Sequence, residues 1–136
     1  MKLALLVLAI VVVAIVFVVR SKASPAPARI TSTATTFVFV KIPEQIMPID
    51  RGAKYEDPLD ESLKRAKLGE VTGGGTQLGK PNADGKKSIE WVGVDVELSD
   101  FERGLQFLKA ELRRLGAPSG TTVEFTRDGK TVTEPM

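Results

Sequence analysis

The sequence lacks cysteine and histidine altogether. Without these residues the chain has no disulfide, no thiolate nucleophile, no imidazole base and no zinc site of the usual nitrogen and sulfur type. Carboxylates acting as general acid and base remain open, but no spacing selects a pair of them. We therefore predict no catalytic residue, no metal site and no cofactor.

Acidic residues are absent from the first 40 positions, and all 17 of them lie beyond that point. Four of the 19 lysines and arginines precede residue 40, which leaves 15 bases against 17 acids in the remainder. The net charge of +2 therefore conceals a slightly acidic C-terminal part. Because proteins that bind phosphate backbones normally carry an excess of bases, nucleic acid is not the expected partner.

A long apolar run opens the chain. Every residue from Leu3 to Val19 is apolar, and Lys2 and Arg20 bound the run. A helix of this length reaches about 25 Å, near the lower limit for crossing a bilayer core of about 30 Å. We therefore predict a single-pass transmembrane anchor over residues 1–20, with residues 3–19 in contact with the membrane.

A cleaved signal peptide is the alternative interpretation of this run. Ala26 and Ala28 have the spacing of a cleavage site, and cleavage would release an exported soluble domain. The apolar core of a signal peptide is usually shorter, and it is rarely followed directly by basic residues, so the anchor is preferred. The downstream bases favour a cytoplasmic domain under the positive-inside tendency, although the side of the membrane stays open.

The composition changes after the apolar run. Residues 21–36 are rich in Ser, Ala, Pro and Thr, and Pro25 and Pro27 favour an extended, solvated chain. We predict a flexible linker over residues 21–36, followed by a small α+β domain over residues 37–136.

Within this domain, hydrophobic periodicity predicts four strands, two helices and one short edge segment. The strands are expected at 37–42, 70–78, 88–98 and 121–127, the helices at 57–68 and 99–115, and the edge segment around 131–133. Residues 44–56 and 79–87 are expected as connections. The order β-α-β-β-α-β matches the ferredoxin-like split βαβ arrangement, an antiparallel sheet with two helices on one face.

Helix boundaries follow from capping residues. Asp57 is expected to cap the first helix, and Gly69 to provide its left-handed C-terminal cap. Ser99 and Glu102 have the spacing of a capping box for the second helix, and Gly116 is expected to stop it.

Three aromatic residues are expected on the sheet face that points away from the helices. The alternation of apolar residues places Phe37, Phe39 and Trp91 on that face. A protein interface explains them, either with a partner or in a homodimer, because aromatic residues are enriched in interface cores. RNA stacking, a small ligand, or coverage of the face by residues 44–56 are the alternatives.

A glycine run raises a separate candidate. Gly73, Gly74, Gly75 and Thr76 could present backbone N–H groups to a phosphate. The run lacks the Lys-Ser/Thr ending of a P-loop, so a bulge or close backbone packing at the start of a strand is the competing interpretation.

Taken together, these features predict a membrane-anchored, non-enzymatic interaction or regulatory module. The competing hypothesis is a small ferredoxin-like enzyme or ligand sensor, with a cleft between the sheet face and residues 44–56. Fold alone does not separate the two, because this layout hosts many activities.

Overall fold

The computed structural model describes residues 34–136. The predicted anchor, its signal-peptide alternative and most of the predicted linker lie outside the described residues. Among residues 34–136, none of the helices has the length and apolar character that a membrane span requires.

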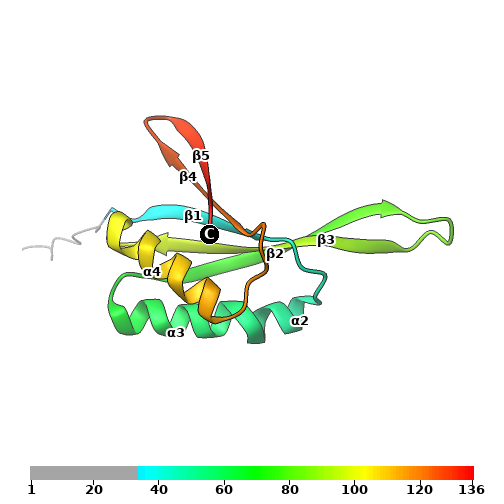
Figure 1. Cartoon of the computed structure of the whole chain (residues 1–136), viewed down its shortest axis with the longest axis horizontal. Helices are drawn as coiled ribbons and strands as arrows, with labels where there is room; N and C mark the ends of the chain where they lie inside the picture. Colours follow the sequence, from blue (N-terminus) through cyan, green and yellow to red (C-terminus); the bar gives the residue numbers. More distant parts are fainter. Residues whose placement is uncertain (1–33) are drawn as a thin grey trace, which may run out of the picture. The chain divides into compact units, whose positions relative to one another are not determined.

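The described chain is an α+β fold, as predicted (Figure 1). Its elements are β1 (Thr36–Ile42), α2 (Pro48–Arg51), the π-helical turn η1 (Gly52–Glu56), α3 (Asp57–Ala66), β2 (Gly69–Pro81), β3 (Lys87–Leu98), α4 (Phe101–Arg114), β4 (Thr122–Arg127) and β5 (Lys130–Pro135). The strands form one antiparallel sheet in the order β2-β3-β1-β4-β5. This order is consistent with the ferredoxin-like arrangement, and the predicted edge segment is a fifth strand.

One face of the sheet is covered by both helices. Alternate strand residues and the apolar stripes of α3 and α4 form a single core, because side chains in a strand alternate between its two faces. We call this the covered face. Its buried cluster contains Val38, Val40, Ile42, Tyr55, Leu59, Leu63, Leu68, Val92, Val94, Val96, Leu98, Leu105, Leu108, Leu112, Val123 and Phe125.

The segment expected as a long connection is largely helical, so that prediction was wrong. The chain enters α2 at Pro48, passes through η1 and continues into α3 without a break. Proline suits the first turn of a helix, where its missing N–H costs nothing. Tyr55, Leu59 and Leu63 are spaced by four residues, so they lie on one side of this continuous helix and reach the core. Asp57 is therefore inside a helix and does not cap one.

Two further caps differ from the prediction. Lys67, at φ 57°, provides the left-handed end of α3, whereas Gly69 is already the first residue of β2. Asp100 caps α4 by accepting a hydrogen bond from the Arg103 N–H at 3.2 Å. The Ser99 N–H binds the Leu68 carbonyl and not Glu102, so the expected capping box does not form and the cap lies one residue later.

The hairpin between β2 and β3 is longer than expected. β1 ends at the pair Ile42 and Val92, but β2 and β3 continue to pair as far as Pro81 and Lys87. The expected loop is thus reduced to a short turn, in which the Asn82 side chain accepts two backbone N–H groups. Figure 1 shows this hairpin projecting as a two-stranded arm beyond the rest of the sheet.

Candidate functional site

The three predicted aromatic residues lie together on the sheet face opposite the helices, which we call the open face. Phe37 and Phe39 alternate with the buried valines of β1, and Trp91 precedes the buried run of β3. Phe37 is 51% exposed, the most open of the three. The structure therefore brings together the side chains that the alternation pointed to.

The aromatic rings make defined contacts. Phe39 and Trp91 meet edge to face with ring centroids 5.8 Å apart, and Lys41 Nζ lies 5.0 Å from the Trp91 ring centroid. Gly93 makes room for this arrangement, since a Cβ there would lie 2.5 Å from the Phe39 ring. The Phe39 and Trp91 rings are therefore held in place by contacts within the domain.

Residues 44–56 do not cover the open face. Their Tyr55 is buried in the core under the covered face, and Arg51 Nη1 donates a hydrogen bond of 2.8 Å to Thr76 Oγ1. Thr76 pairs with buried Val92, which places this contact on the covered side. The interpretation in which this segment shields the aromatic residues is therefore wrong, and the cleft expected for a small enzyme does not form there.

Carboxylates flank the aromatic strip on both sides. Phe39 pairs with Asp95 on β3 and with Glu124 on β4, and Phe37 pairs with Glu97. The Glu97 carboxylate also accepts a hydrogen bond of 2.7 Å from Thr35 Oγ1. Lys41 is the one base among the open-face residues of these central strands, so the surface around the rings is acidic.

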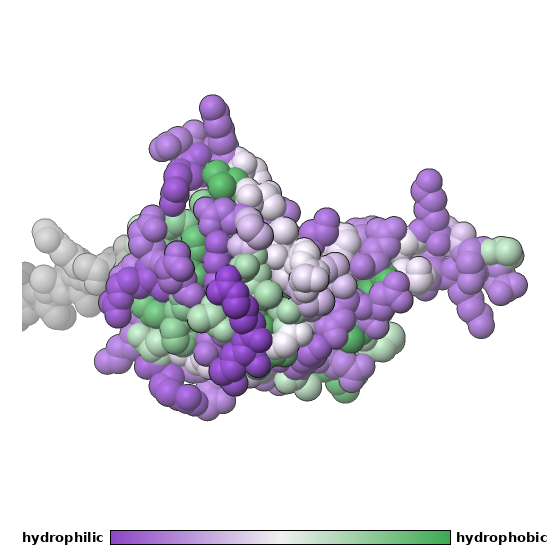
Figure 2. Space-filling view, viewed as in Figure 1, coloured by the Kyte–Doolittle hydropathy of each residue, from purple (hydrophilic) through white to green (hydrophobic). Residues whose placement is uncertain are grey.

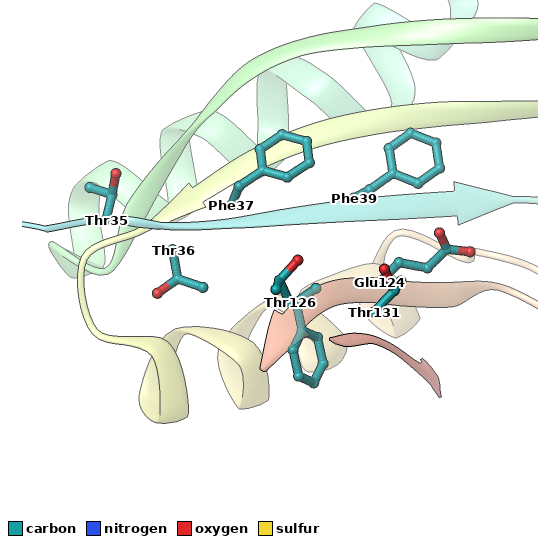
Figure 3. Close-up of a pocket in the computed structure, with 8 residues that line it drawn as sticks. Thr35, Thr36, Phe37, Phe39, Glu124, Thr126 and Thr131 are labelled. Atoms are coloured by element: carbon teal, nitrogen blue, oxygen red, sulfur yellow. The ribbon is translucent and has the colours of Figure 1, made fainter. Parts of the chain in front are cut away.

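A pocket of about 380 Å³ opens beside this strip. β1 and β4 pair only from Val38 to Lys41, and the two strands separate toward the start of β1. Figure 3 shows the side chains of Thr36 and Thr126 between β1 and β4, and the rings of Phe37 and Phe39 on the other side of β1. The lining residues of the pocket are Thr35, Thr36, Phe37, Phe39, Glu124, Phe125, Thr126 and Thr131.

The pocket has the chemistry of a site for a cationic side chain. Phe37 and Phe39 supply aromatic surface, the threonines supply hydroxyl groups, and Glu124 supplies the one carboxylate of the lining. Aromatic faces attract a guanidinium or an ammonium, and a carboxylate accepts a strong hydrogen bond from either. No basic residue of the described chain lines the pocket.

The glycine run lies in β2, and its middle residue, Gly74, is closely packed. A Cβ at Gly74 would lie 2.4 Å from the Glu56 carboxylate, 2.8 Å from the Gly93 carbonyl oxygen and 3.0 Å from Arg51 Nε. Arg51 and Glu56 form a salt bridge at this position. The phosphate site at Gly73–Thr76 stays a prediction, and close packing explains the glycine at position 74.

Glu124 was not among the predicted site residues, although the sequence carries a signal for it. Val123 and Phe125 are core residues, so alternation alone turns Glu124 to the open face. The sequence carries no such signal for the position of the gap between β1 and β4. Among residues 34–136 no group of three acidic residues is placed to hold a metal ion.

Comparisons with known proteins add little. No family model matches the chain, and no curated protein matches it. A solved structure of a phage SAM lyase in complex with S-methyl-5'-thioadenosine is 15% identical, covers 75% of this chain and 90% of that chain, and has a TM-score of 0.40. A likeness of this size supports no conclusion about activity or site.

Proposed function

We propose that this chain is a membrane-tethered interaction module, with a ferredoxin-like domain whose open face binds a basic segment of a partner protein. The observation that carries the proposal is the strip of Phe37, Phe39 and Trp91 flanked by carboxylates and adjoining an acidic, aromatic pocket. The tether is the apolar run from Leu3 to Val19.

The charge of the face selects the kind of partner. Asp95, Glu97 and Glu124 surround the rings, against Lys41 alone. Charge complementarity steers association and suppresses like-charged partners, so a cationic segment is favoured. Two copies of this face would set carboxylates against carboxylates, which disfavours a homodimer here. The same carboxylates repel the phosphates of RNA, so stacking with bases is also disfavoured.

The pocket gives this partner a specific anchor point. An arginine or lysine side chain can lie against Phe37 and Phe39 while its charged end meets Glu124. A cation against an aromatic ring contributes about 0.5–2 kcal/mol, depending on how far it is desolvated. A charge-assisted hydrogen bond adds specificity as well as energy.

Titration with a model side chain tests the pocket. Every residue of the buried cluster lies between Val38 and Phe125, so we expect residues 34–136 to fold without the preceding segment. N-acetyl-arginine methylamide should shift the backbone NMR signals of Phe37, Phe39 and Glu124 at millimolar concentration. N-acetyl-citrulline methylamide, which has a similar shape and no charge, should not.

Two variants complete this test. Glu124→Gln removes the pocket carboxylate and should abolish the arginine-dependent shifts. Asp128→Asn removes a carboxylate at the turn between β4 and β5, outside the pocket lining, and should leave the shifts unchanged. Equal shifts from arginine and citrulline, or shifts that survive Glu124→Gln, would refute the pocket as a cation site.

Photo-crosslinking in membranes tests the partner. A photoreactive phenylalanine analogue at position 37 of the full chain should link it to a protein whose crosslinked segment is rich in Lys or Arg. Glu124→Lys should reduce the yield, because it reverses the pocket charge, and Asp128→Asn should not. The proposal fails if the crosslinked segment is acidic, or if Glu124→Lys leaves the yield unchanged while the purified chain shows turnover of a substrate.

A further inference from the structure

The arm formed by β2 and β3 extends beyond every other strand. Past Val92, β3 pairs only with β2, through Gln77 with Trp91 and Leu78 with Ile89, to the turn at Asn82. A two-stranded ribbon buries little surface by itself, so this extension adds little to the core. Its side chains are therefore available for contact with something outside the domain.

Exposed apolar side chains lie on the arm and at the start of α2. Leu78 is 49% exposed, and Met47 and Ile49, at the start of α2, are 59% and 81% exposed. With Phe37 they are the exposed large hydrophobic residues of the described chain. Figure 2 shows the arm as mainly hydrophilic, with hydrophobic atoms near its base.

A series of contacts places Met47 and Leu78 at the same end of the molecule. The helix α2-η1-α3 runs antiparallel to β2, since Asp60 Oδ1 accepts from the Val71 N–H at 3.0 Å and Arg51 binds Thr76. One turn before Arg51 lies Met47, whose carbonyl accepts the Arg51 N–H. Two residues after Thr76, on the same side of β2, lies Leu78.

Positive charge lies farther out on the same arm. Lys80, Lys86 and Lys87 are all exposed, and Asp84 is the one acid between residues 79 and 87. Within residues 34–136 none of these three lysines takes part in a salt bridge. Aliphatic side chains next to free lysines are the composition of surfaces that bind anionic lipid interfaces.

We infer that the arm and the start of α2 dock on the surface of an anionic bilayer. Leu78, Met47 and Ile49 enter the interface, and the lysines approach the anionic lipid headgroups. The inference rests on the proposed tether, which keeps the domain beside a bilayer. The tether and the arm then hold the domain at the bilayer together, because the tether raises the effective concentration of the arm at the lipid surface.

The length of the preceding chain permits this docking. The arm points away from the start of β1, where the tether joins the domain. β3 has 12 residues and spans about 40 Å. The 16 residues from Arg20 to Thr35 reach about 53 Å when extended, so the far end of the domain can return to the bilayer.

Site-specific fluorescence tests the inference on the full chain. Because the sequence has no cysteine, Ala83→Cys at the arm tip and Thr133→Cys on β5 each accept a single environment-sensitive label. In nanodiscs with phosphatidylglycerol, the label at 83 should shift to the blue and brighten several-fold relative to discs of phosphatidylcholine alone. The label at 133 should not change.

Charge-reversal variants and a competing oligonucleotide test whether anionic lipid causes the fluorescence shift. Reversing Lys80, Lys86 and Lys87 to Glu should abolish the shift, whereas Lys130→Glu on the other hairpin should preserve it. The same emission in both disc types, or a larger shift with a single-stranded oligonucleotide than with lipid, would overturn the inference. Co-elution of the chain with both disc types reports the tether separately, so loss of the tether and loss of arm docking are distinguishable.

Discussion

Gly74 is a residue whose missing side chain the packing requires. A Cβ at this position would lie 2.8 Å from a backbone oxygen, that of Gly93, which cannot rotate away. Gly74→Ala should therefore lower the unfolding free energy by about 1–3 kcal/mol through overpacking. Urea denaturation of residues 34–136 measures the change.

The neighbouring glycine supplies a matched control. A Cβ at Gly75 would meet nothing within 4 Å, so Gly75→Ala should change the unfolding free energy by less than about 0.5 kcal/mol. Equal losses for the two variants would show that strand propensity, and not the contact with the Gly93 carbonyl oxygen, determines the preference for glycine.

Glu44 joins the end of β1 to the following helix. Its carboxylate accepts hydrogen bonds from Lys54 Nζ at 2.6 Å and from the Tyr55 hydroxyl at 2.5 Å. Burial raises the pKa of the Glu44 carboxyl, but these two hydrogen bonds outweigh it, so the pKa lies below its ordinary value of 4.5. The ionised form is therefore favoured by folding.

This lowered pKa makes the stabilisation depend on pH. Glu44→Gln should lose about 1–3 kcal/mol of unfolding free energy at pH 7, where the carboxylate is charged in both states. The difference from the natural chain should persist above pH 4.5 and shrink as the pH falls through the folded-state pKa. Glu61→Gln, at an exposed pair with Arg65, should show a small effect. A loss that does not vary with pH would contradict this account.

The N-terminus of α4 shows how one residue decides a cap. Asp100 accepts the Arg103 N–H, whereas the Ser99 hydroxyl makes only a 3.3 Å contact with the Lys67 carbonyl. Asp100→Ala should lower the unfolding free energy by about 1 kcal/mol, and Ser99→Ala by much less. Thermal unfolding of the two variants distinguishes them. A larger loss for Ser99→Ala than for Asp100→Ala would support the capping box of Ser99 and Glu102 that the sequence predicts.

Elements with regular periodicity were predictable. The spacing of Leu105, Leu108 and Leu112 determined α4, and alternation determined β1 and β3. The helix before Asp57 was not predictable, since Pro48 and Gly52 are typical of loops and the π-helical turn inserts a residue that breaks the 3.6-residue period. Tertiary packing of Tyr55 outweighed these local signals.

The glycine-rich strand illustrates a second limit. Glycine is depleted in strands, so β2 was expected to be short and interrupted. The actual strand continues through Gly73 and Gly75 to Pro81, because β3 pairs with it along this length, with register shifts at three places. Pairing between segments distant in sequence is invisible to local propensity, and the arm was missed for this reason.

At the scale of the whole molecule, part of the candidate site follows from the sequence. Alternation alone placed Phe37, Phe39 and Trp91 on one face, because the covering helices fix which face is core. The pocket depends on where β4 diverges from β1, which is set by twist and by the hairpin to β5. No single segment of the sequence carries a signal for that divergence of the two strands.

The proposed tether concerns the whole chain, because it would determine which surfaces meet a bilayer. We expect the full-length chain, of 14.7 kDa, to stay with membranes after an alkaline wash and to keep residues 1–20 by intact mass. Val11→Lys with Val13→Lys should release it, since each charge near the centre of the span costs about 2.5–3.5 kcal/mol. Leu3→Lys, at the end of the run, should be retained because its side chain reaches the interface. A mature polypeptide that begins near Arg29 and is exported would instead identify a cleaved signal peptide, and it would leave the open face and the arm without a fixed bilayer.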